Sequence, residues 1–266
     1  MTKYIAKIPN EQGFIDYTEE ENQVWHDLFE RQQKIIQNRA SDEFIEGIHL
    51  LGMASDHIPQ IPDMNAALKK ATGWQVHPVA ALISNEEFFG LLTEKKFPAA
   101  TFIRRRDELD YLQEPDIFHE FFGHCPMLTN QSYADFTQIY ARKTLEARPE
   151  DRPYLARLYW FTIEFGLVNT SNGLRIYGGG ILSSKEETIY SLESPIPLRL
   201  PLGNGLDALR TPYRIDILQP IYYVLGHPDE LFNLVNDDLF DTIHKAQDLG
   251  DFPPRFDPTD METYSC

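Results

Sequence analysis

The sequence predicts a mainly α-helical fold with small β ribbons, in a single catalytic domain that spans residues 1–266. Apolar residues recur at helical spacing through most of the chain, whereas glycine and proline gather in a few short extended pieces. No repeat, linker or charge block divides the chain. With 266 residues, of which 42% are hydrophobic and 24% charged, the chain can bury a sizeable core as one domain.

The first part of the chain is predicted to be irregular and then helical. Residues 1–18 show no clear period, and Thr18, followed by three glutamates, is typical of a helix start. Helical spacing then continues to Ile36. Further segments in this half are predicted to be helical at 41–51, 63–72 and 85–93, and extended at 74–82 and 97–103.

The second half is predicted to alternate between helices and short extended pieces. A helix is expected from Pro115 to Phe122, and Gly123 would close it. Other helices are expected over 130–146, 151–165, 183–192 and 229–249. Short strands and turns are expected over 167–182 and extended pieces over 194–219, and the polar tail 259–266 is expected to be flexible.

The charge and the cysteines narrow the class of protein. A net charge of −17 argues against nucleic acid and membrane partners, because such a surface repels phosphates and anionic lipids. Only two cysteines occur, Cys125 and Cys266, so a disulfide framework is not expected. The sequence contains neither a signal peptide nor a run long enough to span a membrane, and we expect a cytoplasmic protein.

Two histidines five positions apart indicate a metal site. In an ideal α-helix His119 and His124 would point about 140° apart, but a helix that ends at Gly123 would let His124 turn back beside His119. The zinc-protease pattern needs histidines four positions apart with a glutamate beside the first, so Glu120 does not complete that pattern.

Glu164 is the best candidate for a third ligand. It lies in the apolar run LYWFTIEFG, where an unpaired carboxylate would be costly to bury. Two histidines and one carboxylate are typical of iron(II) oxygenases, and Asp116 is a candidate acceptor that orients a ligand imidazole. From the residues alone, ordinary core histidines, a zinc hydrolase with the same three ligands and a non-catalytic binding protein all stay open.

Several stretches together resemble the pterin-dependent aromatic amino acid hydroxylases, most closely the compact bacterial phenylalanine 4-hydroxylases. They occur in that family's order and cover nearly the whole catalytic core. The matching stretches are PVAALIS (78–84), EPDIFHEFFGHCPML (114–128), LYWFTIEFGL (158–167), YGGGILSS (177–184), QPIYYV (219–224) and RFDP (255–258).

The resemblance implies an iron(II) monooxygenase that converts L-phenylalanine to L-tyrosine with O2 and a tetrahydropterin, tetrahydrobiopterin or a bacterial analogue, as cosubstrate. It implies that His119, His124 and Glu164 hold the iron. Ile215 is apolar where tyrosine hydroxylases carry an acid, which favours an unsubstituted ring. Tryptophan hydroxylation within the same family is the alternative.

The same resemblance implies roles for further residues. Arg104 matches the arginine that grips the amino acid carboxylate, although a slip to Arg105 or Arg106 is possible. The other implied amino acid contacts are Trp160, Phe165, Gly180 and Ser183. The implied pterin contacts are Leu82, Ile83, Phe88, Glu120, Ala156 and Tyr159, with Glu120 also beside the iron-bound water as a catalytic residue. Core packing and ordinary turns are the simpler interpretations of most of these.

The chain also departs from animal members of that family. Ala81, Pro98 and Leu112 replace a glycine, a histidine and a threonine that many relatives carry near the outer substrate contacts. The animal enzymes' regulatory domain and C-terminal coiled-coil helix have no counterpart in the sequence. We therefore expect a monomer or a small homo-oligomer, not a coiled-coil tetramer, acting on small molecules.

Overall fold

Residues 4–79, 83–112, 114–235 and 238–256 are described in the computed structural model of the chain. The first half contains α1 (Glu19–Ile35), α2 (Asp42–Leu50), α3 (Ile61–Ala71), β1 (Gln75–Val79), α4 (Asn85–Thr93), β2 (Lys96–Ala100), the 3-10 turns η1 (Arg106–Glu108) and η3 (Met127–Thr129), and between them the π-helical turn η2 (His119–His124). The second half contains α5 (Gln131–Glu146), α6 (Arg152–Tyr159), the π-helical turn η4 (Trp160–Glu164), β3 (Leu167–Thr170), β4 (Gly173–Ile176), α7 (Gly179–Leu182), α8 (Lys185–Glu193), β5 (Leu198–Pro201), α9 (Leu206–Arg210), β6 (Ile221–Leu225), α10 (Glu230–Asn233) and α11 (Leu239–Leu249).

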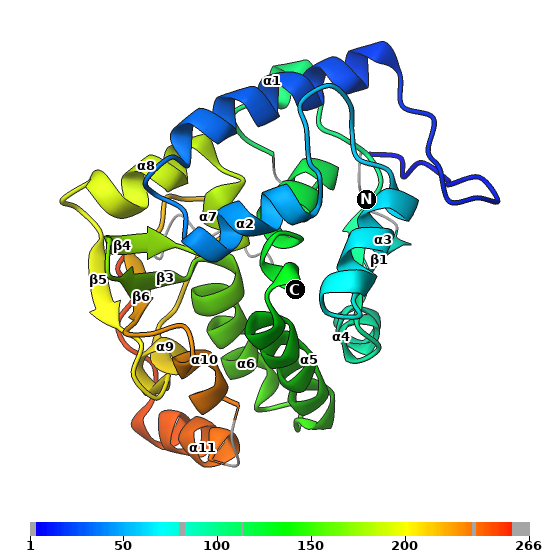
Figure 1. The fold of residues 1–266 in the computed structure, drawn as a ribbon. Coiled ribbons are helices and arrows are strands. Elements are labelled where there is room, and N and C mark those ends of the chain that lie inside the picture. The colour runs from blue at the N-terminus through cyan, green and yellow to red at the C-terminus, as the bar shows by residue number, and fades with distance from the viewer. Residues whose placement is uncertain (1–3, 80–82, 113, 236–237, 257–266) are drawn as a thin grey trace.

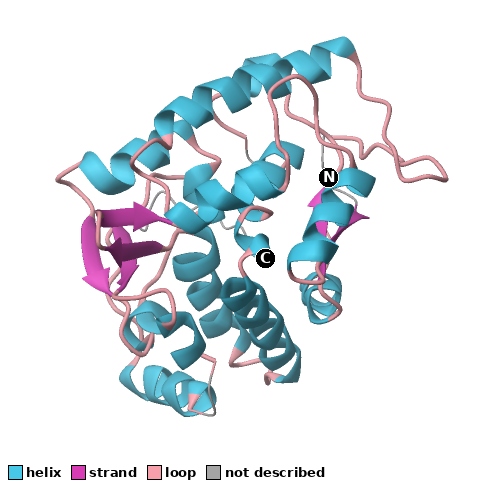
Figure 2. Ribbon diagram, in the orientation of Figure 1, coloured by secondary structure: helices cyan, strands magenta, loops and turns pink. Residues whose placement is uncertain are grey.

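The fold class predicted from the sequence is confirmed. Helices make up about half of the described chain, and the strands form two small sheets (Figure 2). The parallel pair β1–β2 lies beside α3 and α4 at one side of the molecule, and the four strands β4-β3-β6-β5 lie at the other, with α5 and α6 between them (Figure 1). In the larger sheet β3 runs antiparallel to β4, and β6 runs parallel to both of its neighbours.

Most helix starts lie where the capping residues predicted them. Thr18 and Glu21 form a reciprocal capping box at α1, and Asn130 caps α5. Ser84 caps α4 in the same way, by accepting a hydrogen bond from the backbone of Glu87. Local side-chain chemistry therefore explains these boundaries without reference to the rest of the fold.

Several predicted elements differ from the structure. Residues 229–249 form two helices, α10 and α11, not one, because the intervening stretch is rich in Asn and Asp, which favour turns over helix interiors. The extended pieces predicted over 167–182 and 194–219 include the short helices α7 and α9. The predicted strand over 74–82 ends at Val79 among the described residues, and the predicted flexible tail 259–266 lies outside them.

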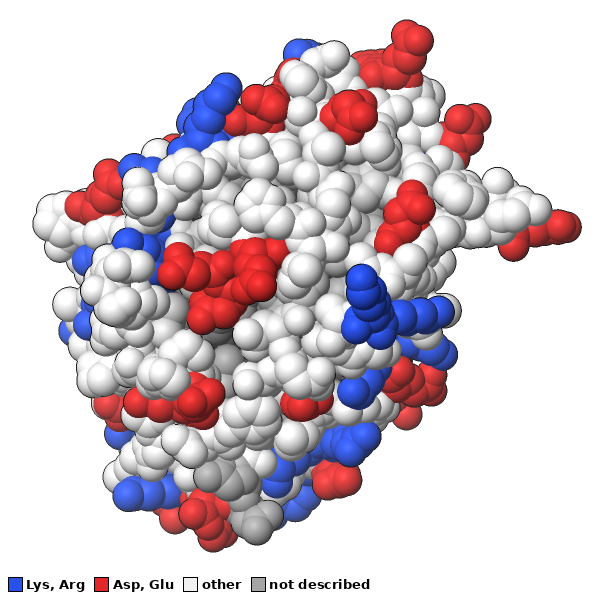
Figure 3. Space-filling view, in the orientation of Figure 1, with Lys and Arg blue, Asp and Glu red and all other residues white. Residues whose placement is uncertain are grey.

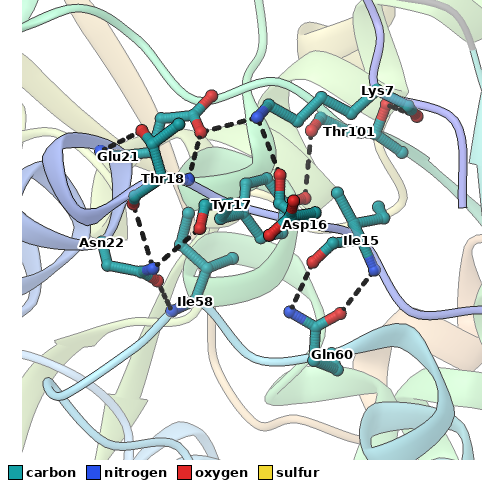
Figure 4. A network of polar contacts seen from close by, with 10 residues as sticks. All are labelled: Lys7, Ile15, Asp16, Tyr17, Thr18, Glu21, Asn22, Ile58, Gln60 and Thr101. Atoms are coloured by element: carbon teal, nitrogen blue, oxygen red, sulfur yellow. Dashed lines mark hydrogen bonds and ion pairs between the residues drawn. The ribbon is translucent and has the colours of Figure 1, made fainter.

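The irregular N-terminal segment is held against the helical body by a polar network (Figure 4). Lys7 forms an ion pair with Glu21 at 2.6 Å, and its carbonyl accepts a hydrogen bond from the Thr101 hydroxyl. The Tyr17 hydroxyl donates to the Thr101 carbonyl at 3.0 Å, and the amide of Gln60 bonds both backbone groups of Ile15. The segment is thereby fixed to the chain directly after β2, which leads to Arg104.

A cluster of aromatic rings fixes η2 in the core. Phe118 and Phe122 stack at 4.9 Å between centroids, and Phe122 meets Phe29 of α1 edge-on at 5.5 Å. Trp25, also on α1, contacts Phe118 at 5.4 Å, and all four rings are almost fully buried. Because such rings bury large apolar areas, the π-helical turn cannot rotate without disrupting the core.

Acidic side chains lie in several separate groups on the face drawn in Figure 3, with uncharged areas and basic side chains between them; the chain as a whole has a net charge of −17. Among the described residues, no helix combines the length and the apolar character that crossing a membrane would need.

Two helix-interior glycines allow a matched stability test. A Cβ added to Gly47 of α2 would lie 2.2 Å from the backbone oxygen of Pro126, just beyond η2, whereas a Cβ on Gly90 of α4 would meet nothing within 4 Å. Gly47→Ala should therefore lower the free energy of unfolding by about 2 kcal/mol through overpacking. Gly90→Ala should raise it by about 0.5 kcal/mol through the better helix propensity of alanine. Urea unfolding followed by circular dichroism measures both, and equal effects would contradict this packing.

Candidate active site

Two π-helical turns carry the three predicted metal ligands. In a π-helix the backbone bonds run from residue i to residue i+5, as between Glu120 O and Cys125 N at 3.2 Å and between Trp160 O and Phe165 N at 2.8 Å. The wider turn places His119 and His124 side by side. The two histidines thus converge as predicted, but the expected reason was wrong, because the helix widens through Gly123 and does not end there.

The three side chains face one another closely. The Nε2 atoms of His119 and His124 are 3.1 Å apart. Glu164 reaches the Nε2 of His124 with Oε1 at 3.3 Å and the Nε2 of His119 with Oε2 at 3.8 Å. These separations suit atoms that share one metal ion at about 2.0–2.2 Å each.

The protonation of His119 also fits a metal ligand. Its Nδ1 lies 2.9 Å from the Ser183 hydroxyl, and that hydroxyl donates its own hydrogen to the Gly179 carbonyl. Ser183 must therefore accept the Nδ1–H of His119, which leaves the Nε2 lone pair facing the centre. Burial, followed by the proximity of His124, lowers the pKa of His119 to about 4, so the ring is neutral at pH 7.

Two carboxyl groups compete for the third ligand position. Ligand atoms of His119, Glu120 and His124 all lie within 4.8 Å of one another, and so Glu120 is a geometric alternative to Glu164. Burial and the charge of Glu164 raise the pKa of Glu120 well above its usual range. Burial alone would also raise the pKa of Glu164, but His124 and His119 outweigh it and hold that pKa low. Glu164 is therefore the ionised group and the better ligand.

Glycines let α7 lie directly against the ligands. A Cβ on Gly179 would approach the Nδ1 of His124 to 2.5 Å, and one on Gly123 would approach the Gly179 oxygen to 2.7 Å. A Cβ on Gly180 would lie 3.0 Å from the Oε2 of Glu164. The role of Gly123 is thus to permit this close approach between η2 and α7.

A cavity of about 420 Å³ opens beside the candidate metal centre. His119 and Glu164 line its inner end. The structure brings all five predicted amino acid contacts to its wall: Arg104, Trp160, Phe165, Gly180 and Ser183. Ile215, which sequence analysis linked to substrate choice, also lines it and is about half exposed.

Arg104 is held in place by a buried carboxylate. Its Nε and Nη2 donate to the two oxygens of Asp116 at 2.8 and 2.9 Å, and its backbone N donates to Asp116 as well. Asp116 also accepts the backbone N–H of His119, at 3.0 Å. The expectation that Asp116 orients a ligand imidazole is therefore wrong, since Ser183 does so. Arg105 and Arg106 are exposed, which leaves Arg104 as the arginine of the cavity.

Asp116 and Arg104 each stabilise the charged form of the other. Burial alone would raise the pKa of Asp116, but Arg104 and the hydrogen bonds from Arg104 and His119 hold it below its usual range. Burial alone would lower the pKa of Arg104, and Asp116 reverses that effect. Both groups stay charged although Asp116 is fully buried and Arg104 is 7% exposed.

Trp160 forms the aromatic wall of the cavity together with its stacking partners. Its ring lies 4.3 Å from that of Phe165 and 4.6 Å from that of Tyr213, both in stacked geometry. The indole N–H donates to Gln219 at 3.0 Å, so the ring is fixed in orientation as well as in position.

Among the described residues, those predicted to contact a pterin do not line this cavity. Phe88 of α4 meets Tyr159 of α6 edge-on at 5.9 Å. Burial, followed by Glu164 and, more weakly, by Glu120, raises the pKa of Tyr159 well above its usual range. Ile83 lies just before α4, and Ala156 is exposed on α6. Leu82 lies outside the described residues. Thus Phe88, Tyr159 and Glu120 form one neighbourhood, which the structure does not join to the cavity of Arg104.

Sequence reasoning missed the buried polar residues that support the site. Gln32, 2% exposed on α1, donates to the Leu182 carbonyl at 2.7 Å and to Thr188 at 2.9 Å, which fixes the turn that contains Ser183. The sequence did contain a signal for this role. Gln32 lies four positions from both Leu28 and Ile36, on the apolar face of a predicted helix, where a buried polar side chain needs hydrogen-bond partners.

The contact between Ser183 and His119 can be tested through metal affinity. Ser183→Ala removes the acceptor that orients the ring, and such losses typically weaken metal binding by about 10- to 100-fold. Titration of the metal-free protein with Co(II), followed by its visible absorption, measures the affinity. Ser132→Ala changes an exposed serine at the start of α5 and should bind Co(II) normally. Unchanged affinity in Ser183→Ala would contradict the proposed orientation of the ligand.

Comparison with known proteins gives consistent matches. Residues 3–242 match the family model described as biopterin-dependent aromatic amino acid hydroxylase. A phenylalanine-4-hydroxylase of Pseudomonas aeruginosa is 54% identical over 97% of this chain and 97% of its own length. A phenylalanine hydroxylase structure from Legionella pneumophila superposes with a TM-score of 0.93 at 54% identity, covering 95% of this chain and all of that one. A phenylalanine hydroxylase structure from Chromobacterium violaceum with bound Fe(III) has a TM-score of 0.88 at 38% identity, covering 96% and 92% of the two chains.

Proposed function

This chain belongs to the biopterin-dependent aromatic amino acid hydroxylases, and we propose that it is a phenylalanine 4-monooxygenase. It converts L-phenylalanine and O2 to L-tyrosine, with iron(II) as metal and a tetrahydropterin as cosubstrate. One oxygen atom enters the ring, and the other leaves on the pterin as the 4a-hydroxy product. The observation that carries this function is the triangle of His119, His124 and Glu164 at the inner end of an aromatic-walled cavity.

A metal held by these three ligands would lie beside the cavity, because His119 and Glu164 line its wall. Two imidazoles and one carboxylate suit iron(II), and a ligand set that leaves coordination positions open suits an oxygenase. When bound, the iron and the tetrahydropterin together activate O2 for attack on the aromatic ring. The protein's own task is then to hold the amino acid, orient its ring toward the open side and keep bulk water out.

Arg104 is the proposed anchor for the amino acid carboxylate. Its guanidinium is charged, buried and kept in position by Asp116, so binding a carboxylate costs little reorganisation. With the carboxylate there, the side chain of the substrate would extend along Trp160 and Phe165 toward His119 and Glu164. Gly180 leaves the space near Glu164 free of a side chain.

The proposed pterin site is the neighbourhood of Phe88, Tyr159 and Glu120, with Ile83 and Ala156 at its edges. Phe88 supplies an aromatic face for stacking, and Glu120 is held protonated by its burial and by the charge of Glu164. A neutral carboxylic acid can donate a hydrogen bond to a pterin or to water at the metal.

Preference for phenylalanine is supported by the apolar Ile215 at the wall of the cavity, which offers nothing to a phenolic hydroxyl. Tryptophan hydroxylation is the family alternative, and a zinc hydrolase is the alternative from the ligands alone. One assay with phenylalanine, tyrosine and tryptophan in competition, in the presence of iron(II) and tetrahydropterin, separates the first two. Oxygen uptake that requires iron would exclude the hydrolase.

We further propose that the protein acts in the cytoplasm as a monomer or a small homo-oligomer, not as a coiled-coil tetramer. The acidic composition and the small-molecule substrates support this view. Size-exclusion chromatography with light scattering would measure the oligomeric state directly.

Replacing Glu164 tests the metal centre. Glu164→Ala should abolish iron-dependent tyrosine formation, because the remaining imidazoles lack the anionic ligand. Chromatographic assay of tyrosine measures this loss, and circular dichroism should show an unchanged fold. Glu186→Ala removes an exposed carboxylate at the rim of the cavity and should retain most activity. Full activity in Glu164→Ala would exclude the assignment.

Replacing Arg104 tests the amino acid anchor. Arg104→Lys keeps the charge opposite Asp116 but loses the planar fork, so the KM for phenylalanine should rise about tenfold or more while that for the pterin changes little. Steady-state kinetics with each substrate varied in turn separates the two constants. Arg105→Lys, at an exposed neighbour, is the matched control. An equal rise in both constants would argue for general distortion in place of carboxylate binding.

A further inference from the structure

A second buried acid lines the cavity without touching the metal ligands. Glu187 of α8 is 5% exposed and lies on the cavity wall. Its Oε1 accepts the backbone N–H of Gln219 at 3.0 Å and a short hydrogen bond from the Tyr222 hydroxyl. The mechanism above gives Glu187 no role, although a buried carboxylate is costly unless its hydrogen bonds repay the burial.

Gln219 links Glu187 to the aromatic wall of the cavity. Its side chain is 1% exposed, and its Oε1 accepts the indole N–H of Trp160 at 3.0 Å. Its Nε2 donates to the carbonyls of Arg214 at 2.8 Å and Ile217 at 2.9 Å, which bracket the cavity-lining residues Ile215 and Asp216. Gln219 thus joins one wall of the cavity, Trp160, to the segment 214–217 at its lip.

We propose that Glu187 is a positioning residue of the amino acid cavity, because its carboxylate holds the backbone of Gln219 and thereby the indole of Trp160. The inference deepens the proposed function, since Trp160 matters as a wall for the substrate ring. Glu187 itself makes no contact with the ligands of the metal; it acts through Gln219.

The strength of the hydrogen bond between the Gln219 backbone and Glu187 depends on the ionisation of Glu187. An ionised carboxylate accepts charge-assisted hydrogen bonds, which are stronger than those to a neutral acid. Burial raises the pKa of Glu187 to about 7, against the hydrogen bonds from Tyr222 and Gln219 that lower it. The group is therefore ionised above pH 7 and neutral below it, so the hold on Gln219 weakens as the pH falls.

The neighbouring charges leave Glu187 as the group that titrates near neutrality in this network. Glu186 raises its pKa slightly further, and the pKa values of Tyr190 and Tyr222 are themselves raised, so both phenols stay neutral. Arg199 is bonded to the backbone at Ser191 and Ser194, and Asp216 is paired with Arg214.

The first experiment follows Trp160 by fluorescence in the metal-free protein between pH 5.5 and 8.5. Trp25 and Trp74 are fully buried, whereas Trp160 is half-buried, so Trp160→Phe identifies its share of the emission. In the unaltered protein the emission maximum of Trp160 should shift to longer wavelength as the pH falls through about 7. Glu187→Gln keeps a neutral acceptor for Gln219 but cannot ionise, so it should show no transition. Gln219→Leu, which cuts the link, should show none either.

The matched control is Glu46→Gln, the same charge change at an exposed residue of α2 that does not line the cavity, which should keep the transition. A transition that persists in Glu187→Gln, or none in the unaltered protein, would overturn the proposal. This arm needs neither metal nor substrate, so it stands even if the proposed reaction fails.

The second experiment measures the KM for phenylalanine at pH 6 and pH 8. We expect the KM at pH 6 divided by the KM at pH 8 to be about fivefold larger in the unaltered enzyme than in Glu187→Gln. This factor corresponds to the difference in strength between a charge-assisted and a neutral hydrogen bond. Glu46→Gln should match the unaltered enzyme. The pterin KM should show no such difference between the variants. Equal ratios in all three proteins would overturn the role of Glu187 in positioning the cavity.

Discussion

The convergence of two imidazoles on one buried carboxylate is the constraint around which the molecule is arranged. Glu164 and His124 lie on separate π-helical turns, and neither turn is close to the other in sequence. Bringing them together requires the aromatic cluster that locks η2 against α1 and the glycines that let α7 lie on the ligands. It also requires Ser183, held by the turn that Gln32 fixes, to orient His119. A carboxylate with no opposing charge would be too costly in such surroundings.

Two carboxyl groups near this centre, Asp116 and Glu120, respond to burial in opposite ways. Asp116 is paired with a guanidinium and remains ionised when fully buried, whereas burial, followed by the charges of Glu164 and Asp116, raises the pKa of Glu120 well above its usual range. The first solution presents a cation to a substrate carboxylate, and the second presents a proton donor near the metal. Carboxyl groups of the same kind thus perform different tasks because of which charges lie within a few ångströms. Cys125, buried beside Glu120, has a raised thiol pKa and takes no part in this chemistry.

Much of this could be predicted from the sequence, and the rest depends on tertiary contacts. Capping residues such as Thr18 and Asn130 determine helix starts locally, and those starts were confirmed. The motifs around His119 and Glu164 are continuous in sequence and carried the family resemblance, which the family match confirms. The wider turn at His119–His124 was not predictable from helical periodicity, because it arises where packing on α7 favours a five-residue repeat. Asp116 was assigned the wrong partner because a pattern cannot show that Arg104 lies beside it in space. Glu187 lies outside the matching stretches and Gln219 begins one of them, but the pattern assigns neither a role; their burial and their hydrogen bonds identify them.

The placement of the ligands on two turns has a thermodynamic consequence. The chain between His119 and Glu164 includes α5 and α6, so an ion bound by both turns closes a long loop of the polypeptide. Such an ion binds the folded chain and not the unfolded one, which makes it a reversible cross-link whose contribution grows with its free concentration. Melting temperatures of this protein therefore carry information about iron supply, and they are comparable between preparations only when metal content is matched.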